Sequence, residues 1–218
     1  ENAVQHWLDQ PIGVLSQAIP LEGKLEAALY GSQVAALFNQ VQLTETGADF
    51  SCTSLGNDPV GLASPVTMRG VTAAYLFANT LVVLEVTEEV LRQTLERCAA
   101  YFTLVDGQPQ ISEEFLLPKV EHYNYDFYAG LSYTFDLRRP VGSRVIHLTK
   151  LDGSPLGSGK FRLCTSNYRA TGTGGYEILR KCPVLWRGGT EMPDLTARYI
   201  QAHSPMPQLH NVEMRVIW

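Results

Sequence analysis

Hydrophobic residues recur at intervals of three and four along residues 32–46, and this spacing places them on one face of a helix. The segment reads SQVAALFNQVQLTET and is followed by a glycine typical of helix ends, Gly47. Its apolar face comprises Val34, Leu37, Phe38 and Val41. The pattern therefore predicts a helix that packs one face against a core.

The clearest helical pattern covers residues 87–102. Thr87 can cap the first turn, and Glu88 and Glu89 favour the positive end of the helix dipole. We interpret its apolar face as core packing; it comprises Val90, Leu91, Leu95, Cys98 and Phe102. Three shorter helices are also expected. The first covers residues 3–9 and is ended by Pro11. The other two cover residues 67–79, capped by Thr67, and residues 194–203, capped by Asp194.

Other segments alternate with period two or form short β-branched runs, which is typical of strands. Such segments lie at residues 12–19, 48–55, 80–86, 131–137, 144–149, 160–166 and 211–218. Helices and strands follow one another without a regular βαβ repeat. The pattern predicts an α+β fold, with a mixed sheet and packed helices.

The composition of the 218 residues agrees with one large globular domain, since 45% are hydrophobic and 18% are charged. The formal net charge is −5 and no basic stripe is present, so binding to a nucleic acid polymer is not expected. No apolar run approaches the length of a membrane span, and LVVLEV, for example, is interrupted by Glu85. The first residue is not Met, and we expect a fragment of a longer protein.

The cysteine and histidine spacings do not predict a metal site. No CxxC pair and no HxxxH or HxH spacing is present. The four cysteines are far apart in apolar segments and are expected to be buried free thiols; they are Cys52, Cys98, Cys164 and Cys182.

The stretch NYRATGTGGYEIL, residues 167–179, packs three glycines between two tyrosines. Gly172 and Gly174 match the first two glycines of a dinucleotide fingerprint, but Glu177 takes the third position and no GK[ST] follows. A phosphate loop, and with it an oxidoreductase, is therefore disfavoured. Two alternatives remain: a tight turn in which glycine supplies positive φ, or a floor that lets a flat ligand approach the backbone.

This stretch and two others together resemble the C-terminal domain of the 5′-nucleotidase family. The other two are GVTAAYLFANTLVVLEVTEEVLRQTLE and YNYDFYAGLSYTFDLRRPVGSRVIHL. The family includes UDP-sugar hydrolases and 2′,3′-cyclic-nucleotide 2′-phosphodiesterase/3′-nucleotidases. The resemblance implies that residues 1–10 end an interdomain linker helix and that residues 11–218 form the substrate-binding domain. It also implies a partner, an N-terminal metallophosphoesterase domain of the same chain that carries two divalent metal ions, whereas this fragment carries no cofactor.

In the family the nucleobase lies between two aromatic rings, and the matching residues here are Phe77 and Tyr176. Gly130 matches a backbone position beside the base. Asn167 and Arg169 are candidates for ligand contact or for structural hydrogen bonds, and Asn79 for base recognition or for capping a turn. No catalytic or metal-binding residue is expected in this part of the chain.

The sequence departs from the family at two places. A GGIR-like turn, whose arginine meets phosphate in 5′-nucleotidases, is replaced by CTSLGND, which leaves Asn57 as the nearest candidate. An acidic residue that follows the second aromatic ring in that branch is replaced by Arg180, Lys181 and Cys182. The motif NYR at residues 167–169 instead resembles the cyclic-phosphodiesterase branch.

The resemblance implies the nucleoside-binding domain of a metal-dependent phosphoric ester hydrolase that takes part in nucleotide breakdown. Its substrate would be a 2′,3′-cyclic nucleotide, a 3′-nucleotide or a 5′-nucleotide, and its location extracellular, periplasmic or at the cell surface. The alternative is a non-catalytic ligand-binding or surface interaction module with the same fold.

Overall fold

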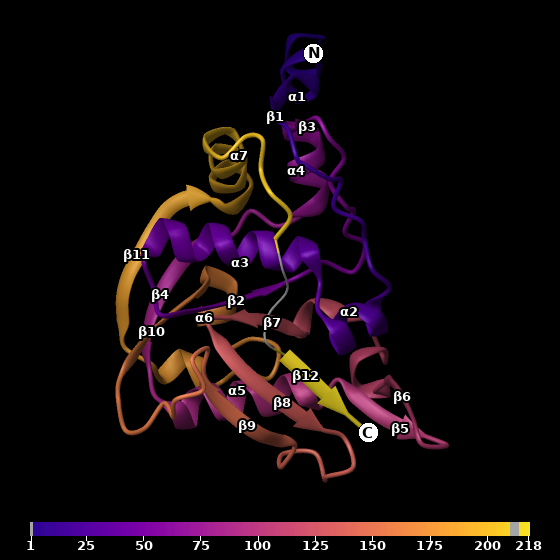
Figure 1. Cartoon of the computed structure of the whole chain (residues 1–218), viewed down its shortest axis with the longest axis vertical. Coiled ribbons are helices and arrows are strands. Elements are labelled where there is room, and N and C mark those ends of the chain that lie inside the picture. Colours follow the sequence, from indigo (N-terminus) through magenta and orange to yellow (C-terminus); the bar gives the residue numbers. More distant parts are fainter. Residues whose placement is uncertain (1, 210–213) are drawn as a thin grey trace.

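The computed structural model describes residues 2–209 and 214–218, in which helices and strands are mixed along the chain without a regular alternation (Figure 1). The helices are α1 (Asn2–Asp9), α2 (Lys24–Tyr30), α3 (Gln33–Thr46), α4 (Met68–Ala74), α5 (Glu88–Ala99), α6 (Asn167–Ala170) and α7 (Met192–Ala202). Single 3-10 turns are η1 (Glu113–Phe115), η2 (His122–Asn124) and η3 (Leu179–Lys181). Among the described helices, none has the length and hydrophobicity that a membrane span requires.

The main sheet has five strands in the order β11-β4-β10-β2-β7. Their bounds are β2 (Phe50–Ser54), β4 (Thr80–Val86), β7 (Asp126–Ala129), β10 (Phe161–Ser166) and β11 (Val184–Glu191). Only the β10–β2 pair is parallel, and the other three pairs are antiparallel. The α+β prediction with a mixed sheet is confirmed.

Smaller sheets flank the main one. A three-stranded sheet has the order β12-β8-β9, from β8 (Leu131–Asp136), β9 (Val145–Lys150) and β12 (Met214–Ile217). Two pairs complete the set: β1 (Pro11–Gly13) with β3 (Val66–Thr67), and β5 (Phe102–Val105) with β6 (Gln108–Ile111). In Figure 1 the three-stranded sheet lies on the side of the molecule away from α7.

Gly47, Thr67 and Thr87 limit helices as the sequence analysis predicted, and Ser32 is a further cap. The Ser32 hydroxyl accepts a hydrogen bond from the Ala35 amide at the start of α3, and Gly47 closes that helix in the left-handed region at φ 56°. Thr67 and Thr87 cap α4 and α5 in the same way. These local contacts explain why α3 begins and ends, and why α5 begins, as predicted. α5 ends at Ala99, and Phe102, which was expected on its apolar face, is the first residue of β5.

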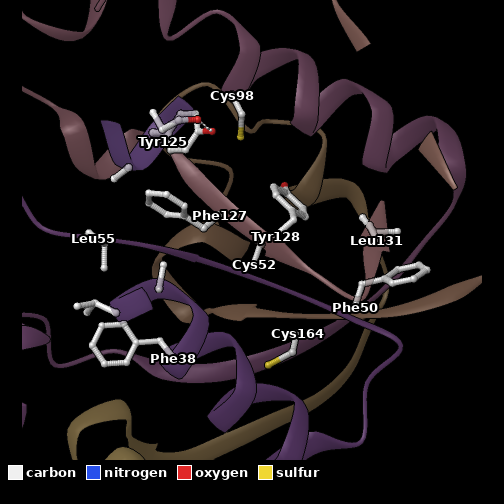
Figure 2. Packing of buried hydrophobic residues seen from close by; sticks show 14 of the residues in the cluster. Phe38, Phe50, Cys52, Leu55, Cys98, Tyr125, Phe127, Tyr128, Leu131 and Cys164 are labelled. Carbon is white, nitrogen blue, oxygen red and sulfur yellow. Dashed lines mark hydrogen bonds between the residues drawn. The ribbon is translucent and has the colours of Figure 1, made fainter. Parts of the chain in front are cut away.

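The core covers both faces of the main sheet (Figure 2). Phe38 of α3 and Cys164 of β10 lie on one side, whereas Tyr128 of β7 and Cys98 of α5 lie on the other. Because both faces are covered, β4 is apolar along most of its length and does not alternate. The four cysteines are all free thiols, and only Cys182 is partly exposed.

Several expected boundaries were wrong. The helix predicted for 67–79 ends at Ala74, because Tyr75 turns into an extended conformation. α7 begins at Met192 rather than at Asp194, since Pro193 suits a first turn and Asp194 lies within that turn. The strand expected at 12–19 is regular only over Pro11–Gly13. Neither α2 nor the β5–β6 hairpin was predicted, and residues 211–213 of the last expected strand lie outside the described residues.

Candidate functional site

One edge of the main sheet gathers the ends of three strands. β2 and β10 are parallel, so both strands end at this edge, at Ser54 and Ser166. The antiparallel strand β4 begins at the same edge, at Thr80. A hollow of about 290 Å³ lies at this edge. Its lining comprises Ser54, Phe77, Asn79, Lys119, Tyr123 and Tyr168.

Aromatic rings form much of the hollow. Phe77 and Tyr123 meet edge to face, with ring centres 6.4 Å apart and an angle of 71° between the ring planes. Tyr168 is 38% exposed, and Phe77 and Tyr123 are half-buried. Partly exposed rings around a small hollow offer the flat apolar surfaces on which a nucleobase stacks.

Each ring is fixed by its own neighbourhood. Phe77 follows α4 and packs edge to face on the buried Tyr75, with ring centres 6.2 Å apart. The side-chain amide nitrogen of Asn79 donates to the Tyr75 hydroxyl (3.4 Å). The backbone carbonyl of Asn79 accepts from the backbone N–H of Met192 (2.9 Å). Asn79 therefore lines the hollow while it also holds the turn into β4.

Asn57 secures the segment that carries Lys119 and Tyr123. Its amide nitrogen donates to the Val120 carbonyl (2.8 Å), and its amide oxygen accepts from the His122 backbone N–H (3.1 Å). Asn57 thus holds the backbone of this loop, with both the nitrogen and the oxygen of its side-chain amide in hydrogen bonds. The sequence analysis considered it only as the nearest candidate for phosphate binding.

Tyr176, expected as the second ring of the base site, is fully buried at 0% exposure. Its hydroxyl donates to the Asn124 carbonyl (2.9 Å) and lies 3.2 Å from Cys98 Sγ. Burial raises the pKa of this hydroxyl well above its ordinary value. The structure does not bring Tyr176 to the hollow, because the glycine loop folds its ring into the core.

Arg169 is likewise buried, at 2% exposure, and makes an ion pair with Asp126. Its Nε and Nη2 donate to the two carboxylate oxygens (2.8 and 2.9 Å), and it also donates to the carbonyls of Thr173 and Tyr123. Of the two alternatives for Arg169, the structural hydrogen bond is what the described residues show. These contacts also anchor the loop on which Tyr123 sits.

The glycine loop wraps closely around this buried arginine. At Gly174 the backbone has φ +82°, and a Cβ would lie 2.8 Å from Arg169 Nη1 and closer still to the Asn124 amide oxygen. The loop therefore needs glycine for close packing against Asn124 and Arg169. Of the two readings of NYRATGTGGYEIL, the tight turn describes its geometry.

Gly130 and Asn167 lie outside the hollow. Gly130 follows β7 next to Asp49 and Phe50, which is the opposite end of β2 from Ser54. Asn167, on α6, accepts a hydrogen bond from the Thr80 amide (3.2 Å) and faces a different cleft. Of the six expected contact residues, the hollow includes Phe77 and Asn79.

Tyr168, Tyr123, Lys119 and Ser54 were not selected from the sequence. Tyr168 stands inside the NYR motif between two residues that were selected, and its ring lines the hollow with Arg169 Cζ 5.7 Å from the ring centre. A tyrosine in a short helical turn beside a buried neighbour is the signal that could have identified it. Tyr123, Lys119 and Ser54 reach the hollow only through the tertiary fold.

Metal ligands do not gather at this site. Within residues 2–209 and 214–218, no group of three His, Cys, Asp or Glu side chains could hold a metal ion. The family resemblance implies a two-metal centre in a separate N-terminal domain, outside these residues.

A profile described as "5′-nucleotidase, C-terminal domain" matches residues 12–181, which is more than half of the chain. The chain belongs to the 5′-nucleotidase C-terminal domain family. The family assignment agrees with the resemblance found in the sequence.

Similar proteins support the same family. A 2′,3′-cyclic-nucleotide 2′-phosphodiesterase/3′-nucleotidase of Haemophilus influenzae is 30% identical over 74% of this chain. The trifunctional nucleotide phosphoesterase protein YfkN of Bacillus subtilis is 26% identical over 63% of it. The chain spans only 27% and 10% of the length of these relatives.

Solved structures show the same domain fold. A Staphylococcus aureus protein assigned as a 5′-nucleotidase superposes with a TM-score of 0.92 at 31% identity, over 99% of this chain and 42% of that one. A 5′-nucleotidase precursor from Thermus thermophilus superposes with a TM-score of 0.77 at 21% identity, over 99% of this chain and 41% of that one. The second likeness, at this identity, shows the fold alone.

Proposed function

We propose that this 5′-nucleotidase C-terminal domain binds the nucleoside part of a nucleotide in the hollow at the end of β2 and β10. The observation that carries the proposal is the convergence of Phe77, Tyr123 and Tyr168 on one hollow of about 290 Å³. In this proposal Phe77 keeps its expected role as one stacking ring. Tyr168 takes the role expected of Tyr176, because only the former exposes a face.

The polar residues of the hollow suit the edges of a stacked base. The Asn79 amide can exchange hydrogen bonds with ring nitrogens and exocyclic groups, and the Ser54 hydroxyl can donate or accept. Lys119 Nζ lies 5.5 Å from the centre of the Tyr123 ring. Its positive charge favours a ligand that also carries phosphate.

We further propose that the reaction is hydrolysis of a phosphoric ester, with a 2′,3′-cyclic nucleotide or a 3′-nucleotide as substrate. The Haemophilus influenzae relative named for these activities supports this class of substrate. The catalytic metal ions would belong to another domain of a longer chain, as the family resemblance implies. A location outside the cytoplasm stays an expectation from that resemblance.

The test is calorimetric titration of the 218-residue chain with adenosine, adenosine 3′-monophosphate and 2′,3′-cyclic AMP. Base–aromatic stacking contributes roughly 1–3 kcal/mol per base, so Tyr168→Ala should weaken binding by about tenfold or more. Tyr168→Phe keeps the ring face and should bind nearly as the parent does. Tyr30→Ala, which removes a 65% exposed tyrosine outside the hollow, is the matched control.

Phe77→Ala should weaken binding to a similar extent. This ring also packs on Tyr75, so the folded state must be checked by circular dichroism. A folded Tyr168→Ala protein that binds all three ligands as tightly as the parent would contradict the proposed stacking role.

A further inference from the structure

A second cleft lies beside the base hollow. It has a volume of about 310 Å³ and is separate from the hollow in its lining. The lining comprises Asn167, Ala170, Thr171, Leu179, Arg180, Cys182, Val184 and Arg187. The cleft is thus built between α6, the η3 turn and the edge strand β11, which Figure 1 shows curving along the outside of β4.

Two arginines supply the charge of this cleft. The ion pairs among the described residues use other cations, namely Arg69, Arg92, Arg97, Arg138, Arg139, Lys160 and Arg169. Arg180 and Arg187 are exposed and take part in none of them. No aspartate or glutamate is among the residues that line the cleft. In a chain with a net charge of −5, this is a local concentration of uncompensated positive charge.

Asn167 adds a neutral donor of fixed orientation. Its amide oxygen accepts from the Thr80 backbone N–H (3.2 Å), which leaves the amide nitrogen as the group available to a ligand. The Thr171 hydroxyl is already engaged with the Tyr168 carbonyl (2.7 Å). The free hydrogen-bonding side chains of the cleft are therefore donors, and donors on two guanidinium forks match the oxygens of a phosphate group.

We propose that this cleft binds a phosphate-class anion through Arg180 and Arg187, with the Asn167 amide nitrogen as a third donor. The site is distinct from the base hollow, and its existence does not depend on nucleoside binding there. The two sites are adjacent, because consecutive residues of α6 serve them: Asn167 lines the cleft and Tyr168 lines the hollow. The anion could be free phosphate or the phosphate of a nucleotide, and the two sources share this chemistry.

The first test is titration of the 218-residue chain with inorganic phosphate at low ionic strength, where screening is weak. We expect saturable binding in the roughly millimolar range that added sodium chloride weakens. Hydrogen bonds to charged groups are strong, so the double variant Arg180→Gln/Arg187→Gln should bind at least about tenfold more weakly. Arg198→Gln, which removes an exposed arginine outside the cleft, should bind phosphate as the parent does.

A second arm separates the two sources of the anion. Adenosine 3′-monophosphate is titrated into the parent, the double arginine variant and Tyr168→Ala. If the nucleotide places its phosphate in the cleft, both variants weaken its binding. If the cleft takes free phosphate, the arginine variant binds the nucleotide normally while its phosphate binding is lost. Either result supports the site, whereas phosphate binding that is absent in the parent or unchanged in the double variant overturns it.

Cys182 provides an independent readout, because it lines the cleft and is the partly exposed cysteine of the chain. Phosphate should slow its alkylation by iodoacetamide in the parent. The same protection should be missing in the double arginine variant. Alkylation that phosphate leaves unchanged in a parent that binds phosphate would place the anion elsewhere and would overturn the assignment to this cleft.

Discussion

The guanidinium of Arg169 lies over the ring of Tyr176, with Cζ 4.0 Å from the ring centre, and both side chains are buried. The same guanidinium makes two hydrogen bonds to Asp126. A cation stacked on an aromatic ring and paired with a carboxylate is satisfied within the core. This relationship gives Tyr176 a structural role, whereas the ring of Tyr168 is partly exposed in the hollow.

Tyr176→Ala should therefore reduce stability far more than Tyr168→Ala does. Removing a fully buried large ring costs about 3–5 kcal/mol, whereas an exposed substitution usually changes stability by less than about 0.5 kcal/mol. Tyr176→Phe should cost about 1 kcal/mol, because the Asn124 carbonyl loses its hydrogen-bond donor. Urea unfolding followed by circular dichroism measures all three. Equal losses for the two alanine variants would show that the burial of Tyr176 does not carry this stability.

The ion pair between Arg169 and Asp126 should be expensive to break. Asp126→Asn or Arg169→Met leaves one partner in the core without its counter-charge, which costs roughly 3–5 kcal/mol. The exposed pair Arg69–Asp9 is the control, since Arg69→Met should cost at most about 1 kcal/mol. Added salt should reduce the effect of the exposed pair and leave that of the buried pair nearly unchanged. Unfolding free energies of the parent and the variants, measured at low and high salt, test this prediction. A larger loss of stability for Arg69→Met than for Asp126→Asn would contradict it.

Alkaline pH should destabilise the fold partly through its buried thiols. Burial raises the pKa of Cys164 to about 12, while a thiol in the unfolded chain keeps an ordinary pKa of about 8.5. Between these values the unfolded state binds fewer protons than the folded state, so the free energy of unfolding falls as pH rises. One such group contributes a slope of up to about 1.4 kcal/mol per pH unit.

Cys164→Ala should remove that contribution, and the slope of stability against pH above about pH 9 should become less steep. Cys182→Ala, which removes the partly exposed thiol, should change the slope less. Equilibrium unfolding at a series of alkaline pH values gives the slopes. Identical slopes for the parent and Cys164→Ala would mean that this thiol is not protected from ionisation.

Gly130→Ala should lower stability without altering nucleoside affinity. Gly130 has φ +87°, and an added Cβ would lie 2.5 Å from the Asp49 carbonyl oxygen, so backbone strain and a backbone clash act together. Gly107→Ala has a comparable φ of +74° but open space around it, and should show only a strain of about 1–2 kcal/mol. The difference between the two variants in urea unfolding isolates the clash. If folded Gly130→Ala lost nucleoside affinity, its expected position beside the base would regain support.

Sequence patterns predicted the elements that local chemistry defines. α3 was predicted with Gly47 at its end and α5 with Thr87 as its cap, because each of these residues acts within one turn of the helix it limits. α6 was missed because it contains only four residues, and a single turn has no periodicity to detect.

The lining of the hollow was only partly predictable for a related reason. Phe77 follows a helix at a corner and lines the hollow. Tyr176 was expected beside a ligand because it follows flexible glycines. Its hydroxyl meets Asn124 and Cys98, which are 52 and 78 residues away along the chain and reach it only in the folded structure. Partners at such separations leave no periodic pattern.

The position of β10 between β4 and β2 has a consequence for folding of the chain during its synthesis. Both neighbours of this strand leave the ribosome early, at residues 50–54 and 80–86, whereas β10 follows only at 161–166. Until then β4 lacks its β10 partner, and its apolar side chains have no complete sheet to join. Strands in this condition are prone to aggregation. A nascent chain halted before residue 161 should therefore depend on chaperones, and one released after β11 should not.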